Sequence, residues 1–388
     1  MTTLTAGRLL APAPHWSDHI TRHGLLPSLT AAQLLDAADA VDVGGRGGGG
    51  FPLSRKLRAA AEHGRGTVIG NCAEGEPASH KDDALLDATP HLVIDGLLLA
   101  ARATNARRVV LAAHEGTAAR RLRSALGQRD DVGRVEVLEL PHRYVAGEAS
   151  ALVRALNGGP SLPQQRRAPL ATGRRPHLVQ NAETLACLAL LARGHRVDTS
   201  LVTMGGAVVQ PGVLEVGGGT TVREAVRQAG GYLEPVQAML VGGYFGRWLA
   251  ADLALDAPLT LEGMRAVGGS LGAGIVLALP SSACGLAATA EVLRYLADQS
   301  ARQCGPCLNG LPAMASALER LAAGDPPPDV AAQLERWADL VRGRGACAHP
   351  DGAAALLTSA LQVFATDVEQ HLTRPCGRPA GRWLEVPR

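Results

Sequence analysis

Short apolar strands alternate with helical segments between positions 67 and 140, and this alternation restricts the possible folds more than any other feature. Thr67–Gly70, Arg107–Ala113 and Val135–Leu140 have the length and apolar character of strands. His91–Ala103 and Thr117–Leu126 carry apolar residues at helical spacing. Helices that alternate with strands predict a mostly parallel sheet, and therefore an α/β domain.

Further helices are expected on the N-terminal side of this alternation. Thr30 can cap a helix, with Gln33 three residues later completing a capping box. A second helix is expected over Ser54–Glu62. Residues 1–30 carry no strong pattern and are expected to form an N-terminal extension, so the α/β domain is placed at residues 31–198.

The segment from 199 to 282 has a different rhythm. Leu201–Val209 and Val213–Val216 read as a strand pair joined by a turn. Thr220 can cap a helix over Val222–Ala229, and Met239–Val241 reads as a further strand. These elements predict a small α+β module.

The remainder of the chain, residues 283–388, is expected to be helical. The expected helices are Leu286–Gln299, Leu311–Ala323, Val330–Leu340 and Ala353–Leu372. Three consecutive prolines after Asp325 separate two of them, because proline cannot continue a helix.

A glycine tract, Gly44–Pro52, leads directly into the helix expected at Ser54. Consecutive glycines let backbone N–H groups approach a phosphate or a planar ring, and the following helix N-terminus favours an anion. Arg46 and Lys56 are able to add positive charge. The spacing fits neither the Walker P-loop nor the dinucleotide fingerprint, and the tract alone is equally consistent with a flexible linker.

Three polar loops follow the tract in the sequence. The first, Asn71–Asp82, comes at the carboxyl end of a short strand, where α/β sheets place their ligands. The second, Tyr144–Leu152, enters a helix, and the third is Gln180–Thr184. Taken singly, each loop is more often a solvated surface than a site.

Seven cysteines are present, and four of them follow residue 300. An odd number in a chain of 388 residues argues against a disulfide framework. Cysteines gathered at one end favour a metal or cluster site, and Cys304 and Cys307 have C-x-x-C spacing.

The formal net charge of +2 and the intermixed charges give no indication of a nucleic-acid partner. No targeting segment is evident, and the apolar run at Val109–Ala113 is far shorter than the roughly 20 residues that span a bilayer. We expect a cytoplasmic protein that is able to dock on a membrane partner.

Taken together and in order, the four motifs resemble those of the flavoprotein subunit of complex I, the respiratory NADH-quinone oxidoreductase. The same motifs occur in its relatives in NAD-linked hydrogenases and formate dehydrogenases. The family pattern is Gly-Arg-Gly-Gly-Ala-Gly-Phe-Pro, Asn-Ala-Asp-Glu-Gly-Glu-Pro-Gly, Tyr-Ile-Cys-Gly-Glu-Glu-Thr-Ala-Leu and Asn-Asn-Val-Glu-Thr. The resemblance extends from about residue 40 to the end of the chain. It implies a flavin-binding α/β domain, followed by a ubiquitin-like β-grasp module and a C-terminal helical bundle.

The resemblance also implies FMN as cofactor, NADH or NADPH as electron donor, and hydride transfer between them. The implied cofactor-binding residues are Gly45, Arg46, Gly47, Gly48, Gly50, Phe51, Lys56, Asn71, Glu74, Gly147, Gln180, Asn181 and Thr184. Glu76 and Glu148 are implied as the catalytic carboxylates of the dinucleotide cleft. The implied electron acceptor is a ferredoxin or a two-iron ferredoxin-like subunit, in or beside a membrane redox complex.

The family also carries a four-iron–four-sulfur (4Fe-4S) cluster in its helical domain, and here the chain departs from the pattern. Cys304, Cys307 and Cys347 match three of the cluster ligands, but Ala301 occupies the place of the first cysteine. Because each iron of a cluster normally needs a thiolate, three forms are open: an altered cluster, a cluster with an outside ligand, or no cluster. Cys284 and Cys376 are possible replacements, although nothing in their spacing favours them.

Other positions depart from the family as well, among them Ala73 and Ala149, each of which replaces a carboxylate, and Leu57 and Gln180. The motifs that are retained favour an oxidoreductase that passes electrons singly onward. The losses favour the alternative, a non-catalytic paralogue that keeps the fold for assembly or binding.

Overall fold

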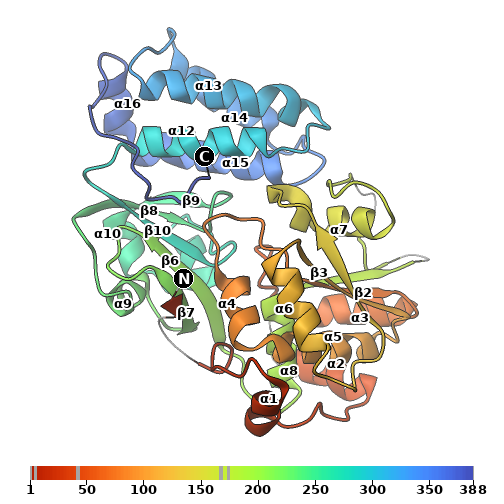
Figure 1. Cartoon of the computed structure of the whole chain (residues 1–388). Coiled ribbons are helices and arrows are strands. Elements are labelled where there is room, and N and C mark those ends of the chain that lie inside the picture. The colour runs from red at the N-terminus through yellow and green to blue at the C-terminus, as the bar shows by residue number, and fades with distance from the viewer. Residues whose placement is uncertain (1, 4–6, 41–43, 166–168, 173–174, 388) are drawn as a thin grey trace. The chain divides into compact units, whose positions relative to one another are not determined.

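The computed structural model describes residues 2–3, 7–40, 44–165, 169–172 and 175–387. The chain divides into two compact units (Figure 1). One contains residues 5–75 and 80–201, and we call it the α/β unit. The other contains residues 1–4, 76–79 and 202–388, and we call it the β-helical unit.

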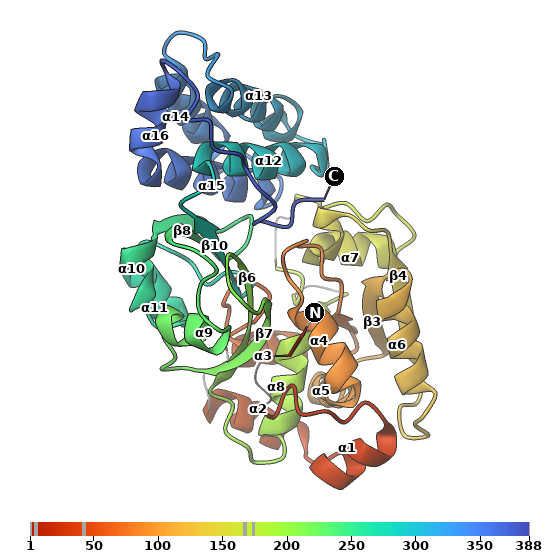
Figure 2. The same ribbon diagram turned by 60° about the vertical axis from the view of Figure 1, so that its left-hand side comes forward.

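A four-stranded parallel sheet forms the centre of the α/β unit, in the order β4-β3-β2-β5. The strands are β2 (Thr67–Asn71), β3 (Arg108–His114), β4 (Val135–Leu140) and β5 (His177–Asn181). The helices are α1 (Trp16–His23), α2 (Ala31–Ala40), α3 (Leu53–His63), α4 (Lys81–Ala88), α5 (Pro90–Ala103), α6 (Thr117–Leu126), α7 (Ala149–Leu156) and α8 (Ala182–Leu191). Helix α6 packs along β3 and β4 (Figure 2). The parallel sheet predicted from the alternation is therefore confirmed.

Residues 1–30 contribute to both units rather than forming a separate extension. Strand β1 (Thr2–Thr3) pairs with an edge strand of the second sheet. Leu9 and Leu10 are buried, and α1 packs in the α/β unit beside α5. Leu9, Leu10 and α1 pack against partners that are distant in the sequence, so no local periodicity could predict their burial.

The β-helical unit contains a six-stranded sheet in the order β1-β7-β6-β10-β8-β9. Its further strands are β6 (Thr199–Gly206), β7 (Gly212–Gly217), β8 (Val236–Val241), β9 (Arg247–Ala250) and β10 (Ile275–Pro280). Its shorter helices are α9 (Val222–Gln228), α10 (Ala251–Leu255) and α11 (Leu261–Ala266). The cap of α9 is Thr221 rather than Thr220, because Glu224 closes a capping box with Thr221.

Five helices follow the second sheet and pack side by side (Figures 1 and 2). They are α12 (Gly285–Asp298), α13 (Leu311–Ala322), α14 (Val330–Val341), α15 (His349–Val363) and α16 (Ala365–His371). The single helix expected over 353–372 is wrong, because the chain breaks at Phe364 (φ −104°, ψ 31°). The Phe364 ring is held edge-on against Trp248, with 5.1 Å between ring centroids.

No single helix among the described residues has the length and apolar character to cross a membrane. Helices α4 and α5 meet that test only when they are taken together, and they are bent by 97° at their junction.

A buried ionic centre holds α1 in the α/β unit. Asp95 on α5 lies 2.7 Å from Arg129, 2.5 Å from Arg193 and 3.0 Å from His19. The guanidinium of Arg129 also lies 4.1 Å from the centre of the Trp16 ring. Burial of a carboxylate is tolerated because these cations pair with it. They lower the pKa of Asp95 to about 2, against the effect of burial.

Two histidines beside this centre make the stability of the α/β unit depend on pH. Burial, together with nearby His19, lowers the pKa values of His23 and His91 to about 4. The unfolded chain therefore binds more protons than the folded chain between pH 4 and about 6.5, so stability falls as pH falls through that window. Asp95 adds little in this window, because its contribution, which also falls as pH falls, is lost mainly below its unfolded pKa of about 3.8.

We expect the free energy of unfolding to fall by about 1 kcal/mol per pH unit below pH 6.5, after allowance for the partial exposure of His23. Urea unfolding at pH 7 and pH 5 measures this slope. His23→Gln should make the slope shallower, and His15→Gln, at an exposed position, should leave it unchanged. Equal slopes in the wild type and His23→Gln would contradict the assignment.

Candidate functional site

We number the glycine tract as the first motif, and the loops that begin at Asn71, Tyr144 and Gln180 as the second, third and fourth. The second and fourth motifs lie side by side at the carboxyl edge of the parallel sheet. Asn71 at the end of β2 is in register with Asn181 at the end of β5. The Asn71 side chain donates a hydrogen bond of 2.9 Å to the carbonyl of Gly147, which brings in the third motif. Three motifs that are distant in the sequence therefore converge at one edge of the sheet, where open α/β sheets bind ligands.

The glycine tract forms a closed loop. An antiparallel bridge joins Gly44 to Pro52, and turns fill the space between them. Gly48 (φ 92°) and Gly50 (φ 60°) adopt left-handed backbone conformations that side chains disfavour. The Arg46 N–H donates a 3.0 Å hydrogen bond to the Thr184 hydroxyl, which attaches the loop to the fourth motif. These bonds are inconsistent with the alternative of a flexible linker.

The side chain of Arg46 is engaged within the α/β unit. Its guanidinium donates to the Ser200 hydroxyl at 2.6 Å and to the Thr199 carbonyl at 3.0 Å, and it lies 3.8 Å from Glu183. Arg46 therefore holds the glycine loop in place, and much of its charge is already compensated.

Phe51 and Lys56 lie close together where the loop enters α3. The Lys56 ammonium is 6.0 Å from the centre of the Phe51 ring. Phe51 is 49% exposed, which is unusual for a large apolar side chain and leaves much of its ring accessible.

Glu74 and Glu148, two of the predicted site carboxylates, cap helices. Glu74 accepts hydrogen bonds from the backbone N–H groups of residues 81, 82 and 83 at the start of α4. Glu148 accepts from Ser150 and Ala151 at the start of α7, at 2.8 and 3.1 Å. Both carboxylates satisfy amides that have no partner within their own helix, so they position the loops that precede those helices.

Close backbone packing joins the second motif to the third. A Cβ atom on Gly147 would lie 2.8 Å from the carbonyl oxygen of Ala73, and one on Gly75 would lie 2.6 Å from that of Tyr144. These glycines are required by the approach of two backbones.

Glu76 belongs to the β-helical unit, unlike Glu148. Its carboxylate accepts a 3.1 Å hydrogen bond from the backbone N–H of Tyr244. Glu76 and Glu148 are thus each positioned by their own unit.

A buried ionic group beneath the motifs was missed by the sequence analysis. Lys81 is 3% exposed, and its ammonium lies 2.8 Å from Glu183 and 3.1 Å from Asp82. Burial alone would lower the pKa of Lys81, but the two carboxylates raise it. Asp82 also accepts a 2.7 Å hydrogen bond from Asn181. The sequence did offer one signal for this group, because Lys81 and Asp82 lie in the second motif and Glu183 lies in the fourth.

Gln180 provides a polar group without a partner at the same edge. Its side chain is 2% exposed, and its amide nitrogen has no hydrogen-bond partner among the described residues. A buried donor of this kind carries a free-energy cost unless a ligand or water accepts from it.

The cysteines predicted as cluster ligands lie at the start of α13 and before α15. A π-helical turn, Pro306–Gly310, carries Cys307, and such turns are frequent at functional sites. Burial would raise the pKa of Cys304, but hydrogen bonds from the backbones of Ala346 and Cys307 lower it. Burial, with Cys304 and Cys347 nearby, raises the pKa of Cys307 to about 12. Cys307 therefore interacts with both Cys304 and Cys347.

Cys284 and Cys376 do not belong to this group of three cysteines. Cys284 caps the beginning of α12, whereas Cys304 follows the end of this helix, which is about 20 Å long. Cys376 lies near Cys284, and its backbone N–H donates to His371. The structure therefore does not favour either cysteine as a replacement for the ligand missing at Ala301.

Comparison with known protein families gives three matches along the chain. Residues 38–190 match the Nuo51 FMN-binding domain, and residues 201–243 match the SLBB domain. Residues 287–371 match the NADH-ubiquinone oxidoreductase-F iron-sulfur binding region. This order of domains defines an FMN-dependent flavoprotein subunit with an iron–sulfur region.

The F-type subunit of NADH-quinone oxidoreductase from Escherichia coli is 29% identical over 91% of this chain and 86% of that protein. An F-type subunit of the same enzyme from Rhizobium meliloti is 28% identical, over 94% and 95% of the two chains. An NAD+-reducing NiFe-hydrogenase in the H2-reduced state superposes with a TM-score of 0.84 at 26% identity, over 98% of this chain and 69% of that chain. The chain belongs to the family of the F-type flavoprotein of complex I.

The geometry of the glycine loop predicts that Gly50→Val sharply lowers FMN content, because a branched side chain would obstruct the backbone approach and strain a left-handed residue. Flavin released by denaturation is counted per folded chain. Gly24→Val is the matched control, since Gly24 has φ 73° and no neighbouring atoms within 4 Å of an added Cβ. Full FMN occupancy in folded Gly50→Val would rule out the assigned loop.

Proposed function

We propose that this chain is an electron-transfer flavoprotein subunit that oxidises NADH or NADPH through FMN. We further propose that it passes the electrons singly to an iron–sulfur cluster and then to a ferredoxin or a two-iron ferredoxin-like subunit. Such a subunit would work at the periphery of a membrane redox complex. The observation that carries the proposal is the convergence of the glycine loop and motifs two, three and four at one sheet edge.

The residues at this edge fit an FMN molecule. The buried amide nitrogen of Gln180 has no hydrogen-bond partner among the described residues, as expected where a ligand accepts from it. Gly45, Gly47, Gly48 and Gly50 would offer backbone N–H groups, and Lys56 would offer a positive charge. Bound FMN would supply a ring that accepts two electrons as a hydride and releases them one at a time.

The remaining residues have supporting parts in this proposal. Asn71 and Asn181 would hold the edge of the flavin pocket, and Thr184 would hold the glycine loop. Glu74, through its cap on α4, and Gly147, through its backbone contact, would shape the pocket wall. Phe51 would offer an aromatic face to the dinucleotide, and Glu76 and Glu148 would be the catalytic carboxylates.

Anaerobic mixing of the FMN-loaded protein with NADH or NADPH tests this function. We expect flavin absorbance to bleach with both dinucleotides, because Ala149 lacks the carboxylate that this family places near the adenosine ribose. Removal of a like charge within ~5 Å relieves about 1–2 kcal/mol of repulsion on a 2′-phosphate. Ala149→Glu should therefore lower the rate ratio of NADPH to NADH by about tenfold.

Two results would contradict this assignment. The alternative, a non-catalytic paralogue, predicts no bleaching by either dinucleotide even after FMN is supplied. A preference of the wild type for NADH above about a thousandfold would reject the role of Ala149.

Cys304, Cys307 and Cys347 fit three ligand positions of a cluster, and no fourth cysteine lies beside them among the described residues. We therefore propose an altered cluster, either a three-iron form or a 4Fe-4S cube whose fourth iron binds water or a partner's ligand. Such a cluster would supply a single-electron relay.

Ala301→Cys should restore the missing ligand, so that a three-iron form rises from about three to about four irons per chain and loses its paramagnetic signal in the oxidised state. A four-iron cube would keep its iron count and become less labile to oxygen. Iron and sulfide analysis and electron paramagnetic resonance of anaerobically purified protein measure this change. Ala332→Cys, at an exposed position on α14, adds a thiol away from the C-x-x-C loop and should leave the iron count unchanged. Less than one iron per chain in both the wild type and Ala301→Cys would mean that the site holds no cluster.

A further inference from the structure

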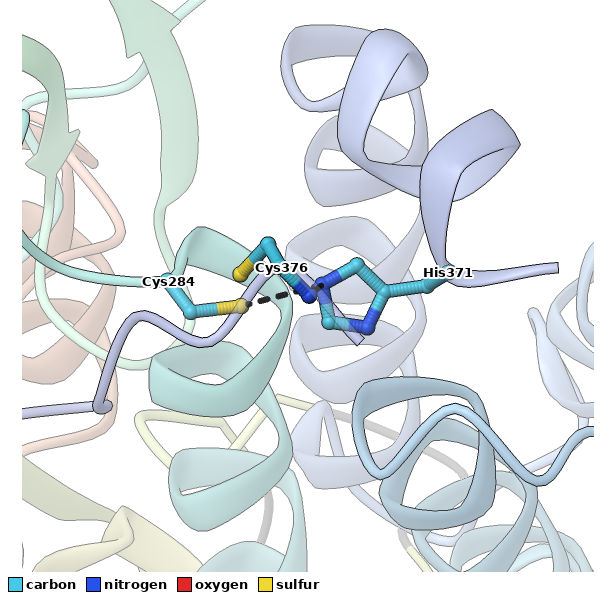
Figure 3. A group of neighbouring side chains, drawn as sticks. All are labelled: Cys284, His371 and Cys376. Atoms are coloured by element: carbon cyan, nitrogen blue, oxygen red, sulfur yellow. Dashed lines mark hydrogen bonds between the residues drawn. The ribbon is translucent and has the colours of Figure 1, made fainter. Parts of the chain in front are cut away.

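Three side chains with metal-ligand chemistry converge at a second place in the β-helical unit (Figure 3). They are Cys284 at the start of α12, His371 at the end of α16, and Cys376 in the segment that follows. Their ligand atoms all lie within 4.8 Å of one another, and Cys284 Sγ is 3.7 Å from His371 Nε2. Cys284 and His371 are each only 1% exposed, whereas Cys376 is half-buried.

These separations fit ligands that share one ion. Zinc binds thiolate sulfur at about 2.3 Å and imidazole nitrogen at about 2.0 Å, so two such ligands of a tetrahedral ion lie roughly 3.5–3.8 Å apart. The 3.7 Å between Cys284 Sγ and His371 Nε2 agrees with this spacing. Thiolates bound to separate irons of a cluster would lie farther apart than ligands of a single ion.

The histidine is oriented as a ligand would be. His371 Nδ1 lies 3.1 Å from the carbonyl of Leu321, which assigns the proton to Nδ1. Nε2 then carries the lone pair, and it faces Cys284 (Figure 3). Its present partner is the backbone N–H of Cys376 at 3.2 Å, the contact that an ion would replace. A carbonyl bonded to the second ring nitrogen is the usual outer support of a metal-bound histidine.

The charges around the group suit a divalent cation bound by two thiolates. Cys284 Sγ accepts a 3.4 Å hydrogen bond from the Ala287 N–H in the first turn of α12. The Arg378 guanidinium lies beside the Cys376 thiol and adds positive charge there. Arg378 is itself paired with Asp367 at 2.5 Å. Two thiolates and a divalent ion would be neutral together, as is the Arg378–Asp367 pair.

We propose that Cys284, His371 and Cys376 bind a single Zn2+ ion, with water as the fourth ligand. The ion fastens the C-terminal segment to the helices. Two hydrogen bonds also attach this C-terminal segment. The Cys284 N–H donates to the Pro379 carbonyl at 2.8 Å, and the Tyr244 hydroxyl donates to the Leu384 carbonyl at 2.6 Å. The site is separate from the cysteines around Cys304, since α12 lies between them.

Metal analysis of the full-length protein, purified anaerobically without added zinc, tests the proposal. We expect about one zinc per chain, and at least a tenfold loss of zinc in Cys376→Ser and in His371→Gln. Cys347→Ser is the matched control, because it removes a thiol of the proposed cluster and should keep its zinc. Limited proteolysis should cut the zinc-free variants after residue 371 and leave the control intact.

Cobalt provides a second readout that does not depend on how the variants fold. Co2+ added to zinc-stripped wild-type protein should give thiolate-to-cobalt charge-transfer bands and the visible bands of a tetrahedral ion. The proposal is overturned by any of three results: no zinc and no cobalt bands, unchanged zinc in folded Cys376→Ser, or a disulfide between Cys284 and Cys376 in anaerobically purified protein. None of these results depends on FMN binding, so failure here is distinct from failure of the proposed function.

Discussion

The buried ammonium of Lys81 is the constraint on which the flavin-side architecture depends. An unpaired charge in the interior costs several kcal/mol, so Lys81 requires both Asp82 and Glu183. Glu183 also accepts a 2.9 Å hydrogen bond from the Leu201 N–H and lies beside Arg46. One carboxylate therefore connects the second motif, the fourth motif and the glycine loop. The loop keeps its shape because the charges beneath it cannot rearrange independently.

Much of the α/β unit could be predicted, because its signals are local. Helix α6 and strand β4 begin and end at the expected residues, and the capping box of Thr30 and Gln33 forms as predicted. Helix α4 was missed, because it has only eight residues and is capped by Glu74, seven positions before its first residue. The break at Phe364 was missed because its cause, the contact with Trp248, is a tertiary one.

The candidate site likewise has a part that local sequence signals could predict and a part that depends on tertiary contacts. Four motifs in order were enough to recognise the family, and the spacing of Cys304 and Cys307 was enough to suggest a cluster. The orientation of the Arg46 side chain depends on Thr199 and Ser200, which are more than 150 residues away. No local sequence pattern could predict this orientation. His371 was missed for the same reason: a lone histidine at a helix end acquires meaning only when Cys284 and Cys376 are folded against it.

The positions of Cys284 and Cys376 along the chain have a consequence for how the helical region unfolds. Helices α12 to α16 all lie between these two cysteines, so an ion that joins them closes a loop around the whole helical region. Because the three ligands meet only when these roughly ninety residues are folded, the ion binds the folded helical region and not the unfolded chain. The free energy of unfolding of the helical region would then rise with the logarithm of the free zinc concentration, as for any ligand that binds only the folded state. The helical region would thus act as a reporter of zinc supply, independently of the redox state of the flavin.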